Sequence, residues 1–288
     1  MQVHNVEEIL ANLSSTCDLL EGKVLHFQIE RSPHCHDRLV ANFLVQMYGR
    51  CGSLEDARKV FDTLSNPNVF SWTMLIKAYA QNGHLEGARS IFDAMPIRDL
   101  RIQPNRSIFA SALAACTHLG DLEHGRRIHE RIHHSKIAGV HDVVIGNALV
   151  TMYARCGDLV SAREFFEGMR EKNSMSWNAI ISAYVQGGHP REALELFARM
   201  TGKLNSFVFA SAFTACSMVG EIDLGKKLYA RFVESGLKPD LIVQNALMSM
   251  YAKCGELDEA RRIFFELPTR DVGAWACLMA GYAQHGDV

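Results

Sequence analysis

The chain has 288 residues, of which 48% are hydrophobic and 22% are charged, and its formal net charge is −2 with a pI of about 6.7. This composition is typical of a soluble folded protein, and no uninterrupted apolar run approaches the ~18 residues of a membrane-spanning helix. We therefore expect no membrane association. The near-neutral balance excludes a uniformly basic nucleic-acid-binding surface, so such a site would have to be a local stripe of Lys and Arg.

The sequence contains eight cysteines and no CxxC pair. Cys51, Cys156 and Cys254 occupy the same place in three successive copies of one sequence segment. Helix layers stack roughly 8 to 10 Å apart, whereas a disulfide needs Cα atoms within ~7 Å of each other. We therefore expect these cysteines to be small buried side chains in a reducing compartment.

The N-terminal residues, MQVHNVEEIL, show neither the apolar core of a secretory signal nor the Arg- and Ser-rich character of an organellar transit peptide. No transit peptide is visible in this chain. We expect that an address was removed or never included, or that the chain is a fragment.

In chain order, the sequence divides into segments of three alternating types, so the chain is an array of repeats. The long type covers residues 3–37, 106–142 and 206–240, and the short type covers 38–68, 143–173 and 241–271. The standard type covers 69–105 and 174–205, and residues 272–288 begin another standard segment that stops after its first helix. We expect these segments to form a single array over residues 1–288.

Each segment predicts two helices, a first helix and a second helix, with apolar residues at helical spacing on both. In repeat 143–173 these residues are Leu149, Met152 and Tyr153, followed by Leu159 and Phe166. Between the helices stands a glycine at a constant place, which suits a left-handed helix end: Gly52, Gly83, Gly120, Gly157, Gly188, Gly220, Gly255 and Gly286.

Aromatic residues also recur at fixed places, Tyr48 and its equivalents in the first helices and Phe61 and its equivalents in the second helices, and we interpret them as core. No strand-like alternation competes with the helical pattern. The predicted fold is therefore an all-α superhelical solenoid of helix-turn-helix repeats, similar to tetratricopeptide arrays.

The motifs NALxxMYAKCGxLxxARxxF, SWNxxIxAYxQxG and FASxxxACxxLG make the chain resemble the pentatricopeptide repeat proteins of plant organelles over essentially its whole length. The alternation of types resembles the PLS class, without the C-terminal deaminase-like domain. The resemblance implies a right-handed superhelix that binds single-stranded RNA, with about one base per repeat. It also implies a role in RNA editing or other processing in a mitochondrion or chloroplast.

By this resemblance, base choice falls to a reading pair, which consists of the fifth residue of the first helix and the last residue of the repeat. A short amide, hydroxyl or carboxylate can meet a Watson–Crick edge with a chosen donor and acceptor pattern. The pairs are Asn42 with Asn68, Thr73 with Asn105, Asn147 with Asn173, Asn178 with Asn205, and Asn245 with Asp271.

The family code translates these pairs into pyrimidine, adenine, pyrimidine, pyrimidine and uracil, which gives the target 5′-?YA?YY?U-3′. Repeat 69–105 is longer and repeat 174–205 shorter than is usual, so the positions of Asn105 and Asn205 depend on how their loops fold. The long repeats carry Glu7 with Asp37, Ala110 with Asp142 and Ala210 with Asp240, and we expect them to space the others and not to read.

Two further sets of residues have open interpretations. Arg50, Arg155 and Lys253 stand near the ends of the first helices of the short repeats, where they would contact phosphates or would be ordinary solvated charges that the helix dipole favours. The second residue of each repeat is apolar in most copies and would either sandwich bases or belong to the core: Leu39, Phe70, Val144, Met175, Phe207 and Ile242.

Rival chemistry has weaker support. His129 to His133 spell HExxH, a zinc peptidase arrangement, but His129 takes the place that His26 and Tyr229 have in other long repeats. His34, Cys35 and His36 lack partners at metal-ligand spacing. A deaminase needs H-x-E with a downstream P-C-x-x-C, and neither half stands in that arrangement.

We therefore predict a protein that is not an enzyme, with no metal, no cofactor and no small-molecule substrate. Its expected partners are single-stranded RNA and editing accessory proteins or a separate deaminase. The alternative is a helical-repeat scaffold that binds proteins or peptides.

Overall fold

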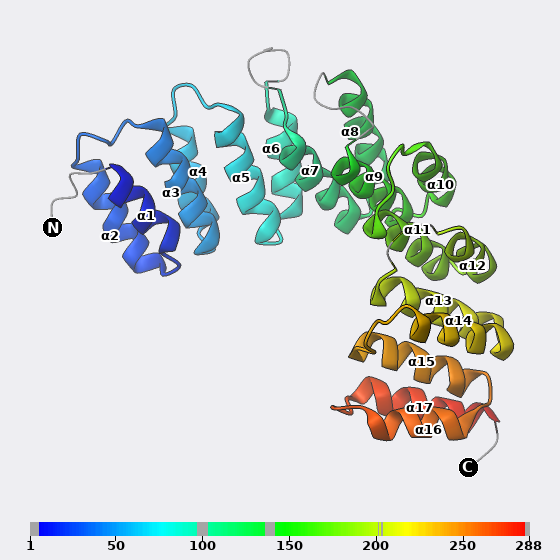
Figure 1. The fold of residues 1–288 in the computed structure, drawn as a ribbon. Coiled ribbons are helices and arrows are strands. Elements are labelled where there is room, and N and C mark those ends of the chain that lie inside the picture. Colours follow the sequence, from blue (N-terminus) through cyan, green and yellow to red (C-terminus); the bar gives the residue numbers. More distant parts are fainter. Residues whose placement is uncertain (1–5, 97–102, 136–141, 201, 203, 286–288) are drawn as a thin grey trace. The chain divides into compact units, whose positions relative to one another are not determined.

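The computed structural model describes residues 6–96, 103–135, 142–200, 202 and 204–285 (Figure 1). Within these ranges the chain forms 17 α-helices and no β-strand. The helices up to the middle of the chain are α1 (Val6–Ser15), α2 (Leu19–Glu30), α3 (Arg38–Arg50), α4 (Leu54–Asp62), α5 (Val69–Gln81), α6 (Leu85–Ala94), α7 (Arg106–Leu119), α8 (Leu122–His134) and α9 (Val143–Arg155). The remaining helices are α10 (Leu159–Gly168), α11 (Ser174–Gln186), α12 (Pro190–Arg199), α13 (Ser206–Val219), α14 (Ile222–Glu234), α15 (Leu241–Lys253), α16 (Leu257–Glu266) and α17 (Val272–His285).

Packing divides the chain into two compact units, Met1–Met152 and Tyr153–Val288. In the first unit, α1, α3, α5 and α7 pack in a row, each against the next. In the second unit, α11, α13, α15 and α17 do the same, and Figure 1 shows the hairpins that carry them. The odd-numbered helices are thus the first helices of the repeats. From α3 onward, each of them begins at the predicted first residue of its repeat. The predicted all-α helical-repeat solenoid is confirmed.

Aromatic residues that recur in the sequence form part of the core, together with Leu, Ile, Val, Met and Ala side chains. In the second helices, Phe92, Phe166 and Phe264 are at most 1% exposed. A ring in the second helix meets the tryptophan of the following first helix edge to face, with 4.9 Å between the centroids of Phe166 and Trp177 and 4.6 Å for Phe264 and Trp275. These contacts tie each hairpin to the next, which is how a solenoid buries its apolar surface.

The glycines between the two helices have the predicted backbone conformation at all described positions, and Gly286 lies outside the described residues. Gly120 and Gly220 end α7 and α13 with φ angles of 68° and 77°, in the left-handed region. An L-residue there would be strained, so glycine allows the tight turn into the second helix.

A second set of glycines, in the second helices of the long repeats, lies where helices approach closely. A Cβ atom on Gly22, Gly125 or Gly225 would overlap the sulfur of a methionine, Met152 in the case of Gly125 and Met250 in the case of Gly225. These methionines belong to the first helix of the following repeat. The absence of a side chain at these glycines therefore allows the first helix of the next repeat to pack closely.

All eight cysteines are free thiols. The expectation that Cys51, Cys156 and Cys254 are buried is wrong, because all three are partly exposed at the turn after a first helix. None of the described helices is both long and apolar enough to cross a lipid bilayer.

Candidate nucleic-acid interface

The last residue of each repeat caps the helix that follows it. Asn68 accepts a hydrogen bond at Oδ1 from Ser71 N over 3.0 Å, and Asp271 Oδ1 accepts one from Ala274 N over 2.8 Å. One side-chain oxygen is therefore committed to the backbone, and the second polar atom of the side chain is held in a fixed direction. The same cap is formed by Asp37, Asn105, Asp142, Asn173, Asn205 and Asp240.

The sequence analysis assigned five of these residues, Asn68, Asn105, Asn173, Asn205 and Asp271, to base recognition and did not predict the cap. The signal was present in two repeats, because Asn68 and Asn173 each precede a serine at the third helical position, Ser71 and Ser176. In both cases the serine hydroxyl accepts from the backbone N–H of the asparagine, which completes a capping box.

The fifth residues of three repeats share an unusual property. Asn42, Asn178 and Asn245 each bury their side-chain oxygen, and none of these oxygens has a hydrogen-bond partner in the described part of the chain. Asn42 as a whole is only 2% exposed. Buried polar atoms in folded proteins nearly always have a partner, so these three equivalent positions share an exception.

One of these oxygens lies beside a pocket. Asn42 and Asn68, a predicted reading pair, line a pocket of about 300 Å³ together with Leu39 and Phe70. Asp37 and Arg38 complete its lining. The structure thus brings a predicted pair together between the second residues of two consecutive repeats.

The second residues of the repeats are exposed, which answers the question that the sequence left open. Exposed fractions range from 40% for Phe70 to 66% for Met175, values that are incompatible with a place in the core. Apolar side chains held at the surface at one position per repeat are suited to contact flat apolar faces. The set also includes Leu39, Val144, Phe207 and Ile242.

The pair Thr73 and Asn105 is in direct contact. Asn105 Nδ2 donates to Thr73 Oγ1 over 3.1 Å, and the threonine hydroxyl donates to Val69 O over 2.6 Å. The extra length of repeat 69–105 therefore does not displace Asn105. In this pair the two side chains satisfy each other, unlike the asparagine oxygens described above.

The other pairs are only partly defined. Asn147 lies half-buried in α9, and its predicted partner Asn173 belongs to the second compact unit, so their separation is not described. Asn178 lies in α11, and Asn205 caps α13 in the same unit.

The predicted phosphate contacts occupy the ends of first helices. Arg50 donates to the main-chain oxygens of Leu13, Ser14 and Thr16, and so caps the end of α1. Arg155 and Lys253 are exposed last residues of α9 and α15. Arg50 thus has a structural role that the sequence did not suggest, and the phosphate contacts stay a prediction.

This cap of one repeat by the next recurs elsewhere. Asn82 Nδ2 donates to Gly49 O over 2.7 Å at the end of α3, and His285 Nε2 lies 3.1 Å from Lys253 O at the end of α15. Side-chain donors on the following repeat therefore satisfy carbonyls that a helix end leaves without partners.

The HExxH motif does not form a metal centre in the described part of the chain, where no group of three or more His, Cys, Asp or Glu side chains could hold a metal ion. His129 and His133 are neighbours on α8, with ring centroids 5.2 Å apart. Burial lowers the pKa of His129, and the nearby His133 lowers it further. His129 is half-buried and His133 is exposed.

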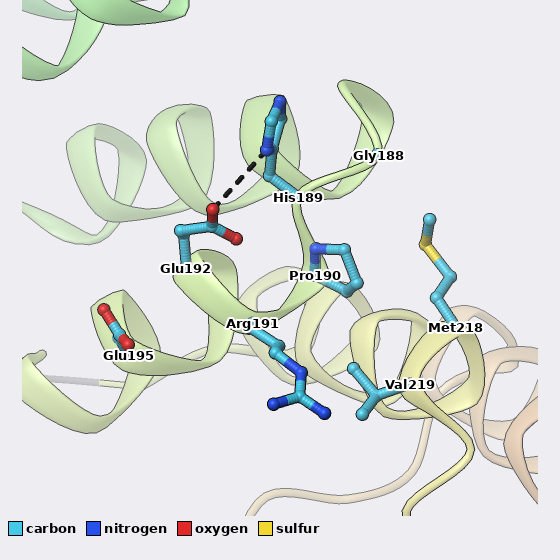
Figure 2. Close-up of a pocket in the computed structure, with 8 residues that line it drawn as sticks. All are labelled: Gly188, His189, Pro190, Arg191, Glu192, Glu195, Met218 and Val219. Carbon is cyan, nitrogen blue, oxygen red and sulfur yellow. Dashed lines mark ion pairs between the residues drawn. The ribbon is translucent and has the colours of Figure 1, made fainter.

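A second pocket, of about 630 Å³, lies between the start of α12 and the end of α13 (Figure 2). His189 Nδ1 is 3.5 Å from Glu192 Oε1, the ion pair drawn in Figure 2. Arg191 on the same turn approaches Glu221 at 3.7 Å. The lining holds ionisable side chains of both signs, and it contains none of the predicted reading residues.

The fold and the site define an α-helical repeat protein with one pair of small polar side chains per repeat in most of its repeats. The family model for the PPR repeat matches residues 40–65, 70–100, 147–174, 175–203 and 245–272. The chain is a member of the pentatricopeptide repeat family. All five matched segments fall on short and standard repeats.

Curated relatives agree with this membership. The chain is 34% identical over 287 residues to a chloroplastic pentatricopeptide repeat-containing protein of Arabidopsis thaliana, across 99% of the chain and 35% of the relative. A putative mitochondrial member from the same plant is 34% identical across 99% of the chain and 45% of the relative. The chain therefore spans less than half the length of these relatives.

Solved structures show the same fold. The crystal structure of the pentatricopeptide repeat protein PPR10 from maize superposes with a TM-score of 0.76 at 19% identity, over 98% of this chain and 42% of PPR10. The structure of PPR10 in complex with an 18-nt psaJ RNA element also gives a TM-score of 0.76, at 18% identity, with 98% and 44% covered.

Proposed function

We propose that the chain binds single-stranded RNA and selects bases through its short and standard repeats, one base per repeat. The observation that carries this proposal is the pocket that the predicted pair Asn42 and Asn68 lines together with Leu39 and Phe70. A nucleobase placed in this pocket would meet the polar side chains with its edge, and Leu39 and Phe70 would contact its two faces. PPR10, the structural neighbour, is known in complex with RNA.

The helix caps explain why the last residue of a repeat can discriminate between pyrimidines. Asp271 uses one oxygen for the cap of α17, and its second oxygen can only accept, which suits the N3–H of uracil. Asn68 uses its oxygen for the cap of α5, and its amide nitrogen donates, which suits the N3 acceptor of cytosine. The cap thus removes the ambiguity of an amide that could otherwise rotate.

The target is 5′-?YA?YY?U-3′, and the family resemblance places the N-terminus of the protein at the 5′ end of the RNA. The names of the two Arabidopsis relatives support a location in a chloroplast or mitochondrion. The alternation of long, short and standard repeats supports the PLS class and hence a part in site selection for RNA editing. In that role the chain would be non-catalytic, and a separate deaminase would supply the chemistry.

The direct test is an electrophoretic mobility shift against a randomised RNA pool, followed by sequencing of the bound fraction. We expect enrichment of the target above. The double variant Asn178→Thr with Asn205→Asp should move the sixth position toward guanine, because it changes both members of one pair and keeps an oxygen for the cap of α13.

The matched control carries the same kind of change where no reading is expected, Ser182→Thr on α11, and should leave the sixth position unchanged. An unchanged preference in the double variant would refute the pair assignment. A pool without any enrichment, together with capture of a peptide ligand on the same face, would favour the protein-binding scaffold.

A further inference from the structure

The long repeat 106–142 begins with an arginine, and the fifth residue of this repeat, Ala110, is not polar. Arg106 is the first residue of repeat 106–142, and its Nε lies 2.7 Å from Asp142 Oδ2, the last residue of the same repeat. The carboxylate is 8% exposed and the arginine side chain is 61% exposed. The ion pair thus joins a buried carboxylate to an accessible guanidinium.

Both oxygens of Asp142 are therefore in use. Oδ1 accepts the cap hydrogen bond from Val144 N over 2.9 Å, and Oδ2 forms the ion pair with Arg106. The fifth residue, Ala110, has no side-chain hydrogen-bonding group. Neither member of this reading pair can contact a base in the manner of Asn42 with Asn68.

Arg106 stands where it can take over that contact. Residues 106 and 110 are four apart on α7 and therefore share one face of the helix. In the short repeat, the equivalent first residue, Arg38, lines the pocket of Asn42 and Asn68. The first residue of a repeat thus lies beside the pocket that the fifth and last residues form.

The chemistry of a held arginine points to one kind of base. With Nε bound to the carboxylate, the two Nη groups remain as a planar pair of donors, and no partner for them is found among the described residues. Guanine offers two adjacent acceptors, O6 and N7, which match such a pair in a bidentate contact. Adenine and cytosine place a donor amine beside their ring acceptor and do not match.

We propose that Arg106, positioned by Asp142, makes repeat 106–142 a guanine-selective repeat and not a neutral spacer. This inference rests on the proposed RNA-binding function and changes the target to 5′-?YAGYY?U-3′. The second long repeat, 206–240, has Ser206 at the equivalent place and has no such arginine to present.

The experiment compares four RNAs that carry the target and differ only at the fourth position. The chain should bind the guanine RNA roughly tenfold more tightly than the other three. In Arg106→Lys the positive charge stays but the planar donor pair is lost, so affinity for the other RNAs should hold while the preference falls to about twofold or less.

Further variants separate the possible roles of the arginine. Arg127→Lys, the same change on α8 of this repeat, should leave the preference intact. Asp142→Asn keeps the cap oxygen and removes the acceptor for Nε, so it should weaken the preference without a large loss of melting temperature. Ser206→Arg, beside Asp240, should create a guanine preference at the seventh position.

Each outcome has one meaning. Equal binding of all four RNAs by the unmodified chain overturns the inference. So does a uniform loss of affinity in Arg106→Ala with a salt dependence reduced by about one ion, because that pattern identifies a phosphate contact. If the chain binds none of these RNAs or the randomised pool, the proposed function itself fails, whereas correct selection at the second, third and eighth positions with indifference at the fourth rejects the guanine assignment alone.

Discussion

The short and standard repeats share their architecture with the long repeats and differ from them mainly at the fifth residue of the first helix. Both kinds form the same helical hairpin and cap the next helix with the last residue, as Asn68 and Asp142 do. At the fifth position, however, Asn42 buries an oxygen that lacks a partner, while Ala110 has nothing to pair. The fold is therefore common to all repeats, and the capacity for recognition depends on hydrogen bonds that the fold leaves incomplete.

This difference implies a cost in stability for the repeats of Asn42, Asn178 and Asn245. A buried polar atom without a partner costs about 1–3 kcal/mol.

The largest expected effect follows from removing the penalty. Asn42→Leu should raise the free energy of unfolding by about 1–3 kcal/mol, because the buried oxygen disappears, and it should abolish base selection at the second position. The reverse change in a long repeat, Ala110→Asn, should destabilise the chain or leave it unchanged. Chemical denaturation and competition with RNAs that vary at the second position measure the two effects. A destabilised Asn42→Leu variant that still selects a pyrimidine would contradict the comparison.

Much of the fold could be predicted from the sequence because the same pattern of apolar residues and glycines recurs in several repeats. The helix starts at Arg38, Val69 and Arg106 follow from the spacing of apolar residues, and the turn glycines follow from their constant place. The site was harder. A sequence gives the members of the pair Thr73 and Asn105 but not their mutual hydrogen bond, which depends on the course of the loop between repeats.

Two roles could not be predicted because one residue type serves several purposes. Asparagine before a helix suits both a cap and a base contact, and the structure shows that Asn68 uses Oδ1 for the cap. Arginine at a helix end suits both a phosphate and a carbonyl, and the partners of Arg50 lie on a helix more than thirty residues earlier in the chain. Which of these roles an asparagine or arginine has depends on its tertiary contacts.

The second prediction separates the cap from the base contact at one residue. Asn68→Ala should lower the free energy of unfolding by about 1 kcal/mol through loss of the cap of α5, and it should also remove selection at the second position. Asn68→Asp retains the cap oxygen, so stability should stay within a few tenths of a kcal/mol while preference moves from either pyrimidine toward uracil. Thermal unfolding and RNA competition, run in parallel, distinguish the two variants. Equal loss of stability in both would show that the cap is unimportant.

The third prediction concerns cations at the ends of first helices. Arg50→Ala should destabilise the first repeat by about 1 kcal/mol, since it leaves three carbonyl oxygens at the end of α1 without their donor. Lys253→Ala should have little effect on stability, but it should reduce the slope of log affinity against log salt by about one if Lys253 contacts a phosphate. An unchanged salt slope in Lys253→Ala would make that side chain an ordinary solvated charge.

The smallest expected effect is an acid sensitivity that belongs to the long repeats. Burial lowers the pKa of His26 below 6.5, although Glu30 and Asp56 partly oppose this shift. The unfolded chain therefore binds more protons than the folded chain below this pH, so the contribution to stability is present above about pH 6.5 and is lost as the pH falls. The hydroxyl of Tyr48 lies 2.9 Å from Nδ1 of His26, and neutral imidazole can accept its hydrogen bond.

His124 and His129, both in the second helix of another long repeat, have pKa values that burial lowers in the same direction. A tyrosine at this place is tolerated in repeat 206–240, where Tyr229 is the equivalent of His129. His129→Tyr should therefore fold at neutral pH and lose less stability than the unmodified chain when the pH is lowered to about 5. Urea denaturation at the two pH values measures the difference. An identical loss in both proteins would assign the acid sensitivity to carboxylates shared by all repeats, and the distinction between long and reading repeats would then be confined to the RNA-binding face.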